Sequence, residues 1–390
     1  MRTDRARLSI VVVAVSALVG TAACAPSPER VAKGSLPELV IGADLELSGA
    51  YAEMGQAYER ALRLRVDQIN ATAARPVRIV IKDNRSDKSL SQQNIGTLAA
   101  DPTISAIITG ACAECAMASV GTVTERGVPL LSLSGATEVA DPKKAGKFVF
   151  KVGPNPKDSA ASLVGELHQQ KIGTTAVIAT NDAYGDDGVA ALTDALKNAD
   201  VQLAETRRVA VTATEVGQTV AAALASDPES LIVWTGSAQA NAIAVEARGA
   251  GYTGQILFDT GAGGDLFFGQ ATAHAAEGAL MAFPQTMVID EIIATSPAKS
   301  TRQQWFRDYT SAYGEYVGYA SFAADALQLV VEAVAQGGGT ARASVQATLQ
   351  FLQIDGYSGP LSLLPDDHSA VMPQALTMLV VRGGRWRLSE

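Results

Sequence analysis

The sequence predicts an α/β protein with two lobes, each built around a parallel sheet. Apolar runs rich in β-branched residues alternate with segments of helical periodicity from residue 38 onward. The same alternation starts again after residues 153–156, Gly-Pro-Asn-Pro. The chain has 390 residues, which is long for one domain and comfortable for two. With 47% hydrophobic residues, it can fill a core in each lobe.

One βαβ unit of this pattern lies at residues 104–132. Residues 104–109 and 128–132 are apolar runs that predict strands, and residues 113–125 between them predict a helix of small residues. The loops 110–115 and 132–137 then share the carboxyl edge of the sheet, where such sheets bind ligands. Their small side chains, hydroxyl groups and backbone N–H groups suit a carboxylate.

The remaining elements of the first half follow the same two periodicities. Apolar runs predict strands over residues 38–45, 77–82 and 148–152. Apolar residues at helical spacing predict helices over residues 53–74 and 89–100.

In the second half, strands are expected over residues 174–180, 201–211, 231–235, 255–258 and 280–283. The expected helices cover residues 159–170, 189–198, 213–226, 240–249, 301–312, 320–335 and 341–350. Glycine and aspartate predict loops at residues 181–188 and 259–265, and Pro284 marks a second passage between lobes. Two hairpins are expected near the end, over residues 351–364 and 375–388.

The charge of the chain argues against a nucleic-acid partner. The formal net charge is −9, whereas binding to phosphates requires clustered Lys and Arg. After the first thirty residues, no stretch is long and apolar enough to predict a membrane span.

The amino terminus predicts export. Arg residues precede an apolar run at residues 8–19, and small residues then lead to Cys24, which indicates a signal peptide over residues 1–23. Ala22 and Ala23 before Cys24 resemble a bacterial lipobox, in which the cysteine is lipidated and becomes the first residue. Thr21 stands where a lipobox usually has Leu, so ordinary cleavage that leaves Cys24 as a free thiol is the alternative. Residues 24–37 are polar and proline-containing, which predicts a lipid-anchored tether.

The other two cysteines, Cys112 and Cys115, have three interpretations. The first is a local disulfide, because an exported protein meets an oxidising compartment. The second is a pair of unpaired buried thiols, and the third is a thioredoxin-like redox centre at a helix start. We expect no metal site, because His168, His274 and His368 do not pair at ligand spacing.

Five motifs occur in an order that resembles the type I periplasmic binding proteins: ELSGAY, IKDNRSD, ISAIITGA, GVPLLSLSGAT and NDAYGDDG. Within that family the sequence looks closest to the leucine/isoleucine/valine- and amide-binding branch of ABC importers. The resemblance implies two Rossmann-like lobes with parallel sheets joined by three crossover segments. The expected first lobe combines residues 38–153 and 285–361, and the second combines residues 154–284 and 362–390.

The resemblance also implies ligand-binding residues in the first lobe. The family holds a ligand carboxylate with the loops after the third and fourth strands, which here correspond to Ala113, Glu114, Cys115, Ser134, Ala136 and Thr137. Glu114 departs from the usual serine and would repel a carboxylate, so it either turns outward or binds a donor. Simple helix capping is the alternative role for Ser134 and Thr137.

Further ligand contacts are implied elsewhere. Tyr184 matches a tyrosine that closes over the ligand, and its alternative is a surface loop aromatic. Tyr319 falls where the family often places an aromatic, with helix packing as its alternative. Asp259 or Thr260 falls near the family carboxylate that pairs with an ammonium group. The ligand therefore stays open between an apolar amino acid, an amide and another small polar or aromatic compound.

The resulting hypothesis is a solute-binding lipoprotein, not an enzyme, that closes on its ligand by a hinge motion. Lipidated Cys24 would anchor it to the outer face of the cell membrane. The implied partners are the permease and ATPase subunits of an ABC importer; we expect a monomer and no cofactor. The alternatives are a thiol-disulfide oxidoreductase that uses Cys112 and Cys115, and a ligand-sensing subunit of a membrane receptor.

Overall fold

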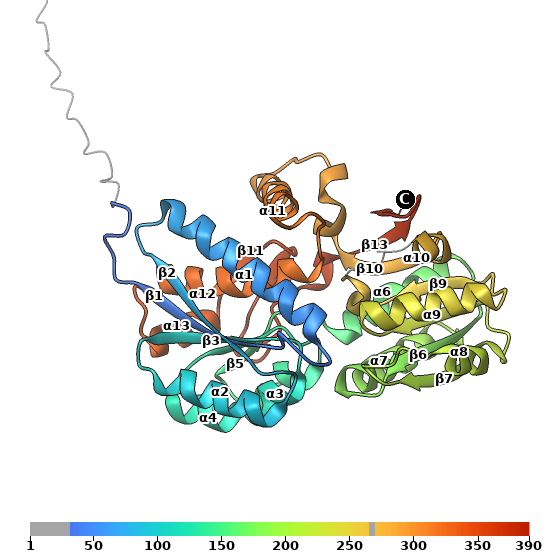
Figure 1. The fold of residues 1–390 in the computed structure, drawn as a ribbon, viewed down its shortest axis with the longest axis horizontal. Helices are drawn as coiled ribbons and strands as arrows, with labels where there is room; N and C mark the ends of the chain where they lie inside the picture. Colours follow the sequence, from blue (N-terminus) through green and yellow to red (C-terminus); the bar gives the residue numbers. More distant parts are fainter. Residues whose placement is uncertain (1–31, 265–269, 390) are drawn as a thin grey trace, which may run out of the picture.

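A computed structural model describes residues 32–264 and 270–389 and shows two α/β lobes side by side (Figure 1). The expected signal peptide, Cys24 and most of the expected tether lie outside the described residues. Within residues 32–264 and 270–389, no helix is long and apolar enough to span a bilayer.

The first lobe contains a five-stranded parallel sheet in the order β2-β1-β3-β4-β5. Its strands are β1 (Leu39–Leu45), β2 (Val77–Asp83), β3 (Ile104–Thr109), β4 (Leu130–Ser132) and β5 (Val149–Lys151). The residues of β1 and β3 are all buried, because helices cover both faces of the sheet.

Alternate residues of these strands face two separate layers of helices. Ile41 and Ile108 pack in the core that contains α1 (Ala52–Thr72) and α12 (Tyr319–Gln336). Val40 and Ile107 pack in the opposite core, with α2 (Lys88–Ala100) and α4 (Val120–Arg126). Figure 1 shows these layers above and below the sheet. The lobe also includes α3 (Ala113–Ala118), η1 (Thr137–Ala140), α5 (Pro142–Ala145) and α13 (Arg342–Leu349).

The second lobe contains a seven-stranded sheet in the order β14-β13-β10-β9-β8-β6-β7. The five strands from β10 to β7 run parallel, whereas β13 and β14 form an antiparallel edge. The strands are β6 (Thr174–Thr180), β7 (Gln202–Val209), β8 (Ser230–Trp234), β9 (Gln255–Phe258), β10 (Leu280–Pro284), β13 (Leu376–Val381) and β14 (Trp386–Leu388).

Two layers of helices cover this sheet as well. One layer contains α6 (Pro156–Gln169) and α7 (Ala183–Asn198), and the other contains α8 (Gly217–Leu224) and α9 (Ser237–Gly249). Shorter elements are η2 (Thr260–Ala262), α10 (Gln270–Ala275) and η4 (Pro373–Ala375).

The chain passes between the two sheets three times. It leaves β5 for α6 at residues 152–155, and it leaves β10 for α12 through η3 (Gln285–Glu291) and α11 (Pro297–Tyr313). It returns to β13 after the small antiparallel pair β11 (Gln353–Asp355) and β12 (Pro360–Ser362). The N–H group of Lys151 in β5 donates to the His368 carbonyl at 2.8 Å. Residue 368 therefore still contacts the first-lobe sheet, and the third passage follows it.

The expected loop at residues 181–188 is wrong, because α7 already begins at Ala183. Asp182 caps the helix by accepting a hydrogen bond from the Gly185 N–H at 2.9 Å. Gly188 allows the helix to lie against the sheet, since a Cβ there would come within 2.3 Å of the Trp234 ring. Gly185 and Gly188 therefore permit α7 to pack closely on the ends of the strands that carry Thr180 and Trp234, and they do not mark a turn. The expected helix at residues 113–125 is likewise divided into α3 and α4.

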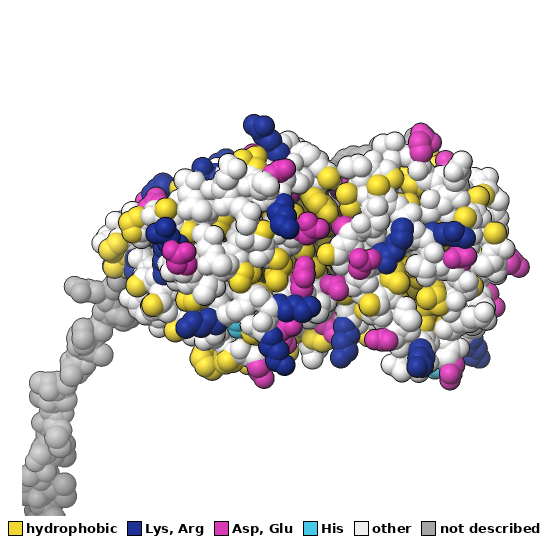
Figure 2. Space-filling view, turned by 90° about the horizontal axis from the view of Figure 1, so that it is seen from below, with side chains coloured by type: hydrophobic (Ala, Val, Ile, Leu, Met, Phe, Trp, Pro, Cys, Tyr) yellow, Lys and Arg dark blue, Asp and Glu magenta, His cyan; other side chains and the backbone are white. Residues whose placement is uncertain are grey.

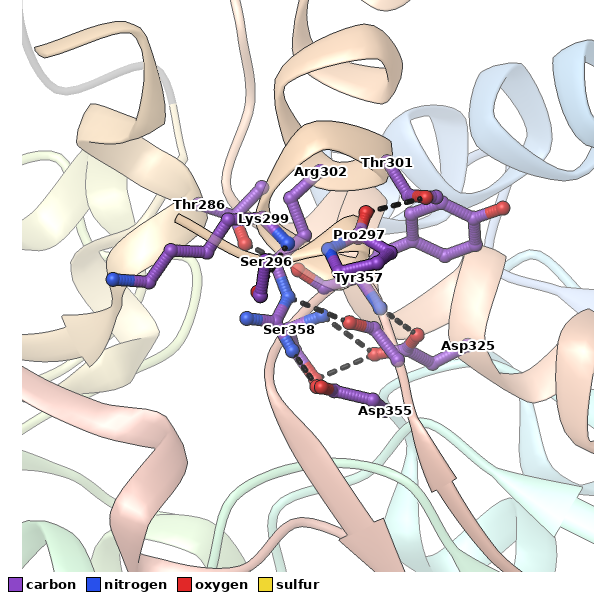
Figure 3. Close-up of polar contacts among 11 residues, drawn as sticks. Thr286, Ser296, Pro297, Lys299, Thr301, Arg302, Asp325, Asp355, Tyr357 and Ser358 are labelled. Carbon is purple, nitrogen blue, oxygen red and sulfur yellow. Dashed lines mark hydrogen bonds and ion pairs between the residues drawn. The ribbon is translucent and has the colours of Figure 1, made fainter. Parts of the chain in front are cut away.

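Asp325 on α12 organises the turn between β11 and β12 (Figure 3). Its side chain is fully buried. It accepts hydrogen bonds from the N–H groups of Tyr357 and Ser358, the latter at 2.8 Å, and from the Ser358 hydroxyl. Burial raises the pKa of Asp325 to about 6, while these hydrogen bonds act in the opposite direction.

The second passage between the lobes binds the same turn. The hydroxyl of Thr286, in η3, donates to the Tyr357 carbonyl. Arg302, in α11, donates from Nε to the Gly356 carbonyl at 2.8 Å and forms an ion pair with Asp355. The turn is therefore held from α12, η3 and α11 at once, next to the place where the chain changes lobes.

Candidate functional site

A cavity of about 750 Å³ lies between the two lobes. Its walls are mainly the loops that follow β1, β3 and β4 in the first lobe and β6, β8 and β9 in the second. Within each sheet these strands run parallel, so their carboxyl ends lie at one edge of the sheet. The carboxyl edges of the two sheets face the same cavity. This is the position that the sequence predicts for a ligand site.

Six of the predicted site residues line the cavity: Ala113, Glu114, Ser134, Tyr184, Thr260 and Tyr319. Ala113 and Glu114 begin α3 and Ser134 follows β4 in the first lobe, Tyr184 and Thr260 belong to the second lobe, and Tyr319 begins α12. Tyr51 and Met54, which follow β1, also line the cavity.

The other four predicted residues are not among those that line the cavity. Cys115 and Ala136 are buried within the first lobe. The N–H group of Thr137 donates to Oδ2 of Asp187 at 2.6 Å, so it joins the lobes beside the cavity. Asp259 lies beneath the second-lobe wall, where it is fully buried.

Asp259 supports the wall residue Tyr184. The Tyr184 hydroxyl donates to Oδ2 of Asp259, and the Gly261 N–H donates to the same oxygen at 3.0 Å. Burial raises the pKa of Asp259 to about 7. Of the two adjacent candidates at this turn, Thr260 thus faces the cavity and Asp259 faces the interior.

Sequence reasoning missed Glu46, a fully buried carboxylate at the end of β1. Glu46 accepts hydrogen bonds from the N–H groups of Ala111 at 3.0 Å and Cys112 at 3.2 Å, in the loop after β3. Asn84 donates to it at 3.4 Å. Burial raises the pKa of Glu46 to about 7. The only signal in the sequence is the acidic residue within ELSGAY, which reads as part of a solvent-exposed loop.

Contacts between the lobes hold the cavity closed. The Tyr51 hydroxyl donates to Oδ2 of Asp182 at 2.9 Å. Tyr319 contacts the second lobe through the Gly261 carbonyl and through the Ser237 hydroxyl, at 3.0 Å from the latter. These contacts join side chains of the first lobe to loops of the second on two sides of the cavity.

Gly135 allows the Tyr184 ring of the second lobe to lie close to the first-lobe wall. A Cβ at this position would lie 2.7 Å from the Tyr184 ring, which is shorter than real Cβ contacts. Glycine therefore permits Tyr184 to approach the first-lobe loop.

Lys151, a second buried charge missed in the sequence, lies behind the same wall. Its Nζ donates to the carbonyls of Gly135 and Pro154, each at 3.2 Å, and to Oδ1 of Asn155 at 2.7 Å. Burial lowers the pKa of Lys151 to about 7. The three N–H groups of the Lys151 ammonium thus hold residues 152–155, the first passage between the lobes, against the first lobe.

Cys112 and Cys115 form a disulfide, the first of the three interpretations of this pair. Both residues are buried. Thiol-disulfide exchange requires a thiolate to reach one of the sulfurs, which burial opposes. Glu46, Cys112 and Cys115 also bring their ligand atoms within 4.8 Å of one another. The sulfurs are bonded to each other, however, and a disulfide does not supply the thiolates that a metal site requires.

Comparison with known proteins supports this architecture. The profile of a family described as Periplasmic binding protein matches residues 38–385. A search of curated proteins found no significant match.

Solved structures with the same fold share little sequence with this chain. An extracellular ligand-binding receptor from Rhodopseudomonas palustris HaA2 has a TM-score of 0.81 and 19% identity, over 90% of this chain and 99% of that one. A solute-binding protein of an ABC transporter from Rhodopseudomonas palustris BisB5, in complex with 3,4-dihydroxybenzoic acid, has a TM-score of 0.78 and 16% identity, covering 90% and 95%. A branched-chain amino acid transporter substrate-binding protein from Streptococcus pneumoniae, in complex with isoleucine, has a TM-score of 0.76 and 20% identity, covering 90% and 99%.

Proposed function

The chain belongs to the periplasmic binding protein family, and we propose that it captures a small molecule outside the cytoplasm and delivers it to an ABC importer. The observation that supports this function best is the cavity of about 750 Å³ enclosed by loops of both lobes. Three narrow passages join the lobes, so they can open and close as rigid bodies around the ligand. Its partners would be the permease and ATPase subunits of the importer.

The cavity is suited to binding and release of a small organic molecule. Its volume is within the range of small-molecule sites, and it combines aromatic walls with a few polar groups. Similar structures contain isoleucine or an aromatic acid, so the fold accommodates more than one class of solute. We infer no chemical reaction at this site.

Calorimetric titration of the purified protein with amino acids, amides, amines and aromatic acids tests the proposal. We expect saturable binding of at least one small metabolite. Tyr184→Ala removes a ring from the cavity wall and is expected to weaken that binding about tenfold, or about 1.4 kcal/mol. Tyr313→Ala, which changes a tyrosine outside the cavity, is the matched control and should bind as the native protein does.

Two results would contradict the proposal. One is a folded protein that binds none of these solutes. The other is a loss of affinity in Tyr313→Ala as large as the loss in Tyr184→Ala.

We further propose that lipidated Cys24 anchors the protein to the outer face of the cell membrane. The lipobox-like Ala22-Ala23-Cys24 and the tether after it support this location. Cys24→Ser is expected to move the protein from the membrane fraction to the soluble fraction, measured by fractionation and immunoblotting. Native protein that is already soluble would exclude the anchor and leave solute binding unaffected.

A further inference from the structure

The backbone donors of the first-lobe loops are largely used within the protein. The N–H groups of Ala111 and Cys112 donate to the carboxylate of Glu46. The N–H group of Ala136 donates to the Ser134 hydroxyl at 3.2 Å, and that of Thr137 donates to Asp187. Four of the backbone N–H groups at the carboxyl edge of the first-lobe sheet thus already have acceptors. A bound anion would have to compete with the protein's own carboxylates for them.

The charged side chains around the cavity are mostly acidic. Glu53, Glu114 and Asp182 line it, and among the lining residues in the described part of the chain Lys88 is the one cation. Lys151 lies behind the wall and directs its three N–H groups to other acceptors. Figure 2 shows acidic side chains along the line where the two lobes meet, with Lys and Arg side chains beside them on the surface. A carboxylate brought into this space would meet like charge.

The tyrosines of the cavity present acceptors and aromatic faces. The hydroxyl hydrogens of Tyr51 and Tyr184 are donated to Asp182 and Asp259, so these hydroxyl oxygens can only accept from a ligand. Tyr58 and Tyr319 add two further rings to the lining, with centroids 6.3 Å apart. The faces of such rings attract cations.

The pKa values of these tyrosines agree with an acidic interior. Burial is the main cause that raises the pKa of Tyr51, and the charges of Asp182, Glu46 and Glu114 raise it further. Burial is also the largest cause that raises the pKa of Tyr319, and the charge of Glu53 is the second largest. Carboxylates are thus the charges that act on the hydroxyls of both tyrosines.

Building on the function proposed above, we propose that the solute carries an ammonium or guanidinium group on an apolar or aromatic body and has no carboxylate. The acidic lining and the tyrosine oxygens would accept its N–H groups, and the rings would pack on its body. An anionic group in the same place would be desolvated beside the carboxylates of Glu53, Glu114 and Asp182, which is costly. This preference separates the protein from relatives that bind an amino acid or an aromatic acid.

Two sets of compounds with matched carbon skeletons test the inference by calorimetry at pH 7.5. The first set is 3-methylbutylamine, 3-methylbutanamide and 3-methylbutanoate, and the second is 2-phenylethylamine, 2-phenylacetamide and 2-phenylacetate. In each set we expect the amine to bind at least tenfold tighter than the amide, and the carboxylate to bind most weakly. Leucine, which has both charges, should bind more weakly than leucinamide.

A charge variant tests the same point independently. Glu114→Gln removes one carboxylate of the lining and is expected to weaken amine binding about fivefold, the effect of one solvent-exposed unit charge at about 4 Å, without changing amide binding. Glu125→Gln changes an exposed carboxylate outside the cavity and should leave both affinities unchanged.

The outcomes separate the inference from the function on which it rests. If a carboxylate, an amino acid or a neutral amide is the tightest ligand, or if Glu114→Gln strengthens amine binding, the inference is wrong and solute binding stands. If none of the six compounds binds but another solute of the wider titration does, the inference is wrong and the proposed function stands. If no solute of either titration binds, the proposed function fails and the inference fails with it.

Discussion

Replacing Asp325 by alanine is expected to lower the free energy of unfolding by about 3 kcal/mol, the cost of leaving several buried donors without acceptors. In the native protein, one carboxylate accepts from two backbone N–H groups and from the Ser358 hydroxyl, all of them buried. Alanine offers no acceptor, so these buried donors lose their partner. The effect can be measured from urea titrations at pH 7.5, followed by circular dichroism.

Asp325→Asn is the matched control, because it keeps the shape of the side chain and one acceptor oxygen. We expect it to lose about 1 kcal/mol, since part of the hydrogen bonding survives. Equal losses for the two variants would show that one acceptor oxygen is not enough, and that the turn requires both oxygens of the carboxylate. A loss below about 1 kcal/mol in Asp325→Ala would contradict the role assigned to the carboxylate.

The turn that Asp325 holds also contacts a connection between the two lobes. This turn binds Thr286 and Arg302, which lie where the chain passes from the second lobe to the first. The cluster therefore fixes one of the three connections around which the lobes would move. Its polar contacts join segments distant in sequence, so no local pattern could have predicted them.

The strands were predictable because burial on both faces requires continuous apolar runs. The expected limits of β3 and β6 agree with the structure, and both strands are rich in β-branched residues and have a partner strand on each side. The first turn of α7 was not predictable in the same way. Its glycines read as a loop, whereas they are needed because Gly185 packs on Thr180 at the end of β6 and Gly188 packs on Trp234 at the end of β8.

The site was predictable in its position and less so in its details. Strand order places the first-lobe loops at one edge, so Ser134 and Glu114 could be assigned to the cavity from the βαβ pattern. The choice between Asp259 and Thr260 depends on how the chain turns after β9, and adjacent residues there face opposite sides. Glu46 was missed because its partners Ala111 and Cys112 come from a different strand end.

Ionisation of Glu46 is expected to lower the stability of the protein as the pH rises from 4.5 to about 7. Burial raises the pKa of this carboxyl from 4.5 to about 7, so the folded state holds the proton more tightly than the unfolded chain. Below pH 4.5 both states are protonated and the stabilisation is complete, and it is lost as the pH passes through the folded pKa. A pKa difference of this size corresponds to about 3 kcal/mol.

Glu46→Gln isolates this contribution, because the amide oxygen can still accept from the loop after β3 while the side chain no longer titrates. Asp259 and Asp325, whose pKa values are also raised by burial, remain in both proteins, so their effects cancel in the difference. We expect the variant to gain stability relative to the native protein between pH 4.5 and 7.5, by about 2–3 kcal/mol in urea titrations across this range. Glu46→Ala, which removes the acceptor of Ala111 and Cys112, should be less stable than Glu46→Gln at every pH.

A difference between native protein and Glu46→Gln that does not change with pH would mean that Glu46 keeps an ordinary pKa. In that case the acidic charge behind the first-lobe loop would be permanent at neutral pH, and the loop would be still less suited to an anionic solute.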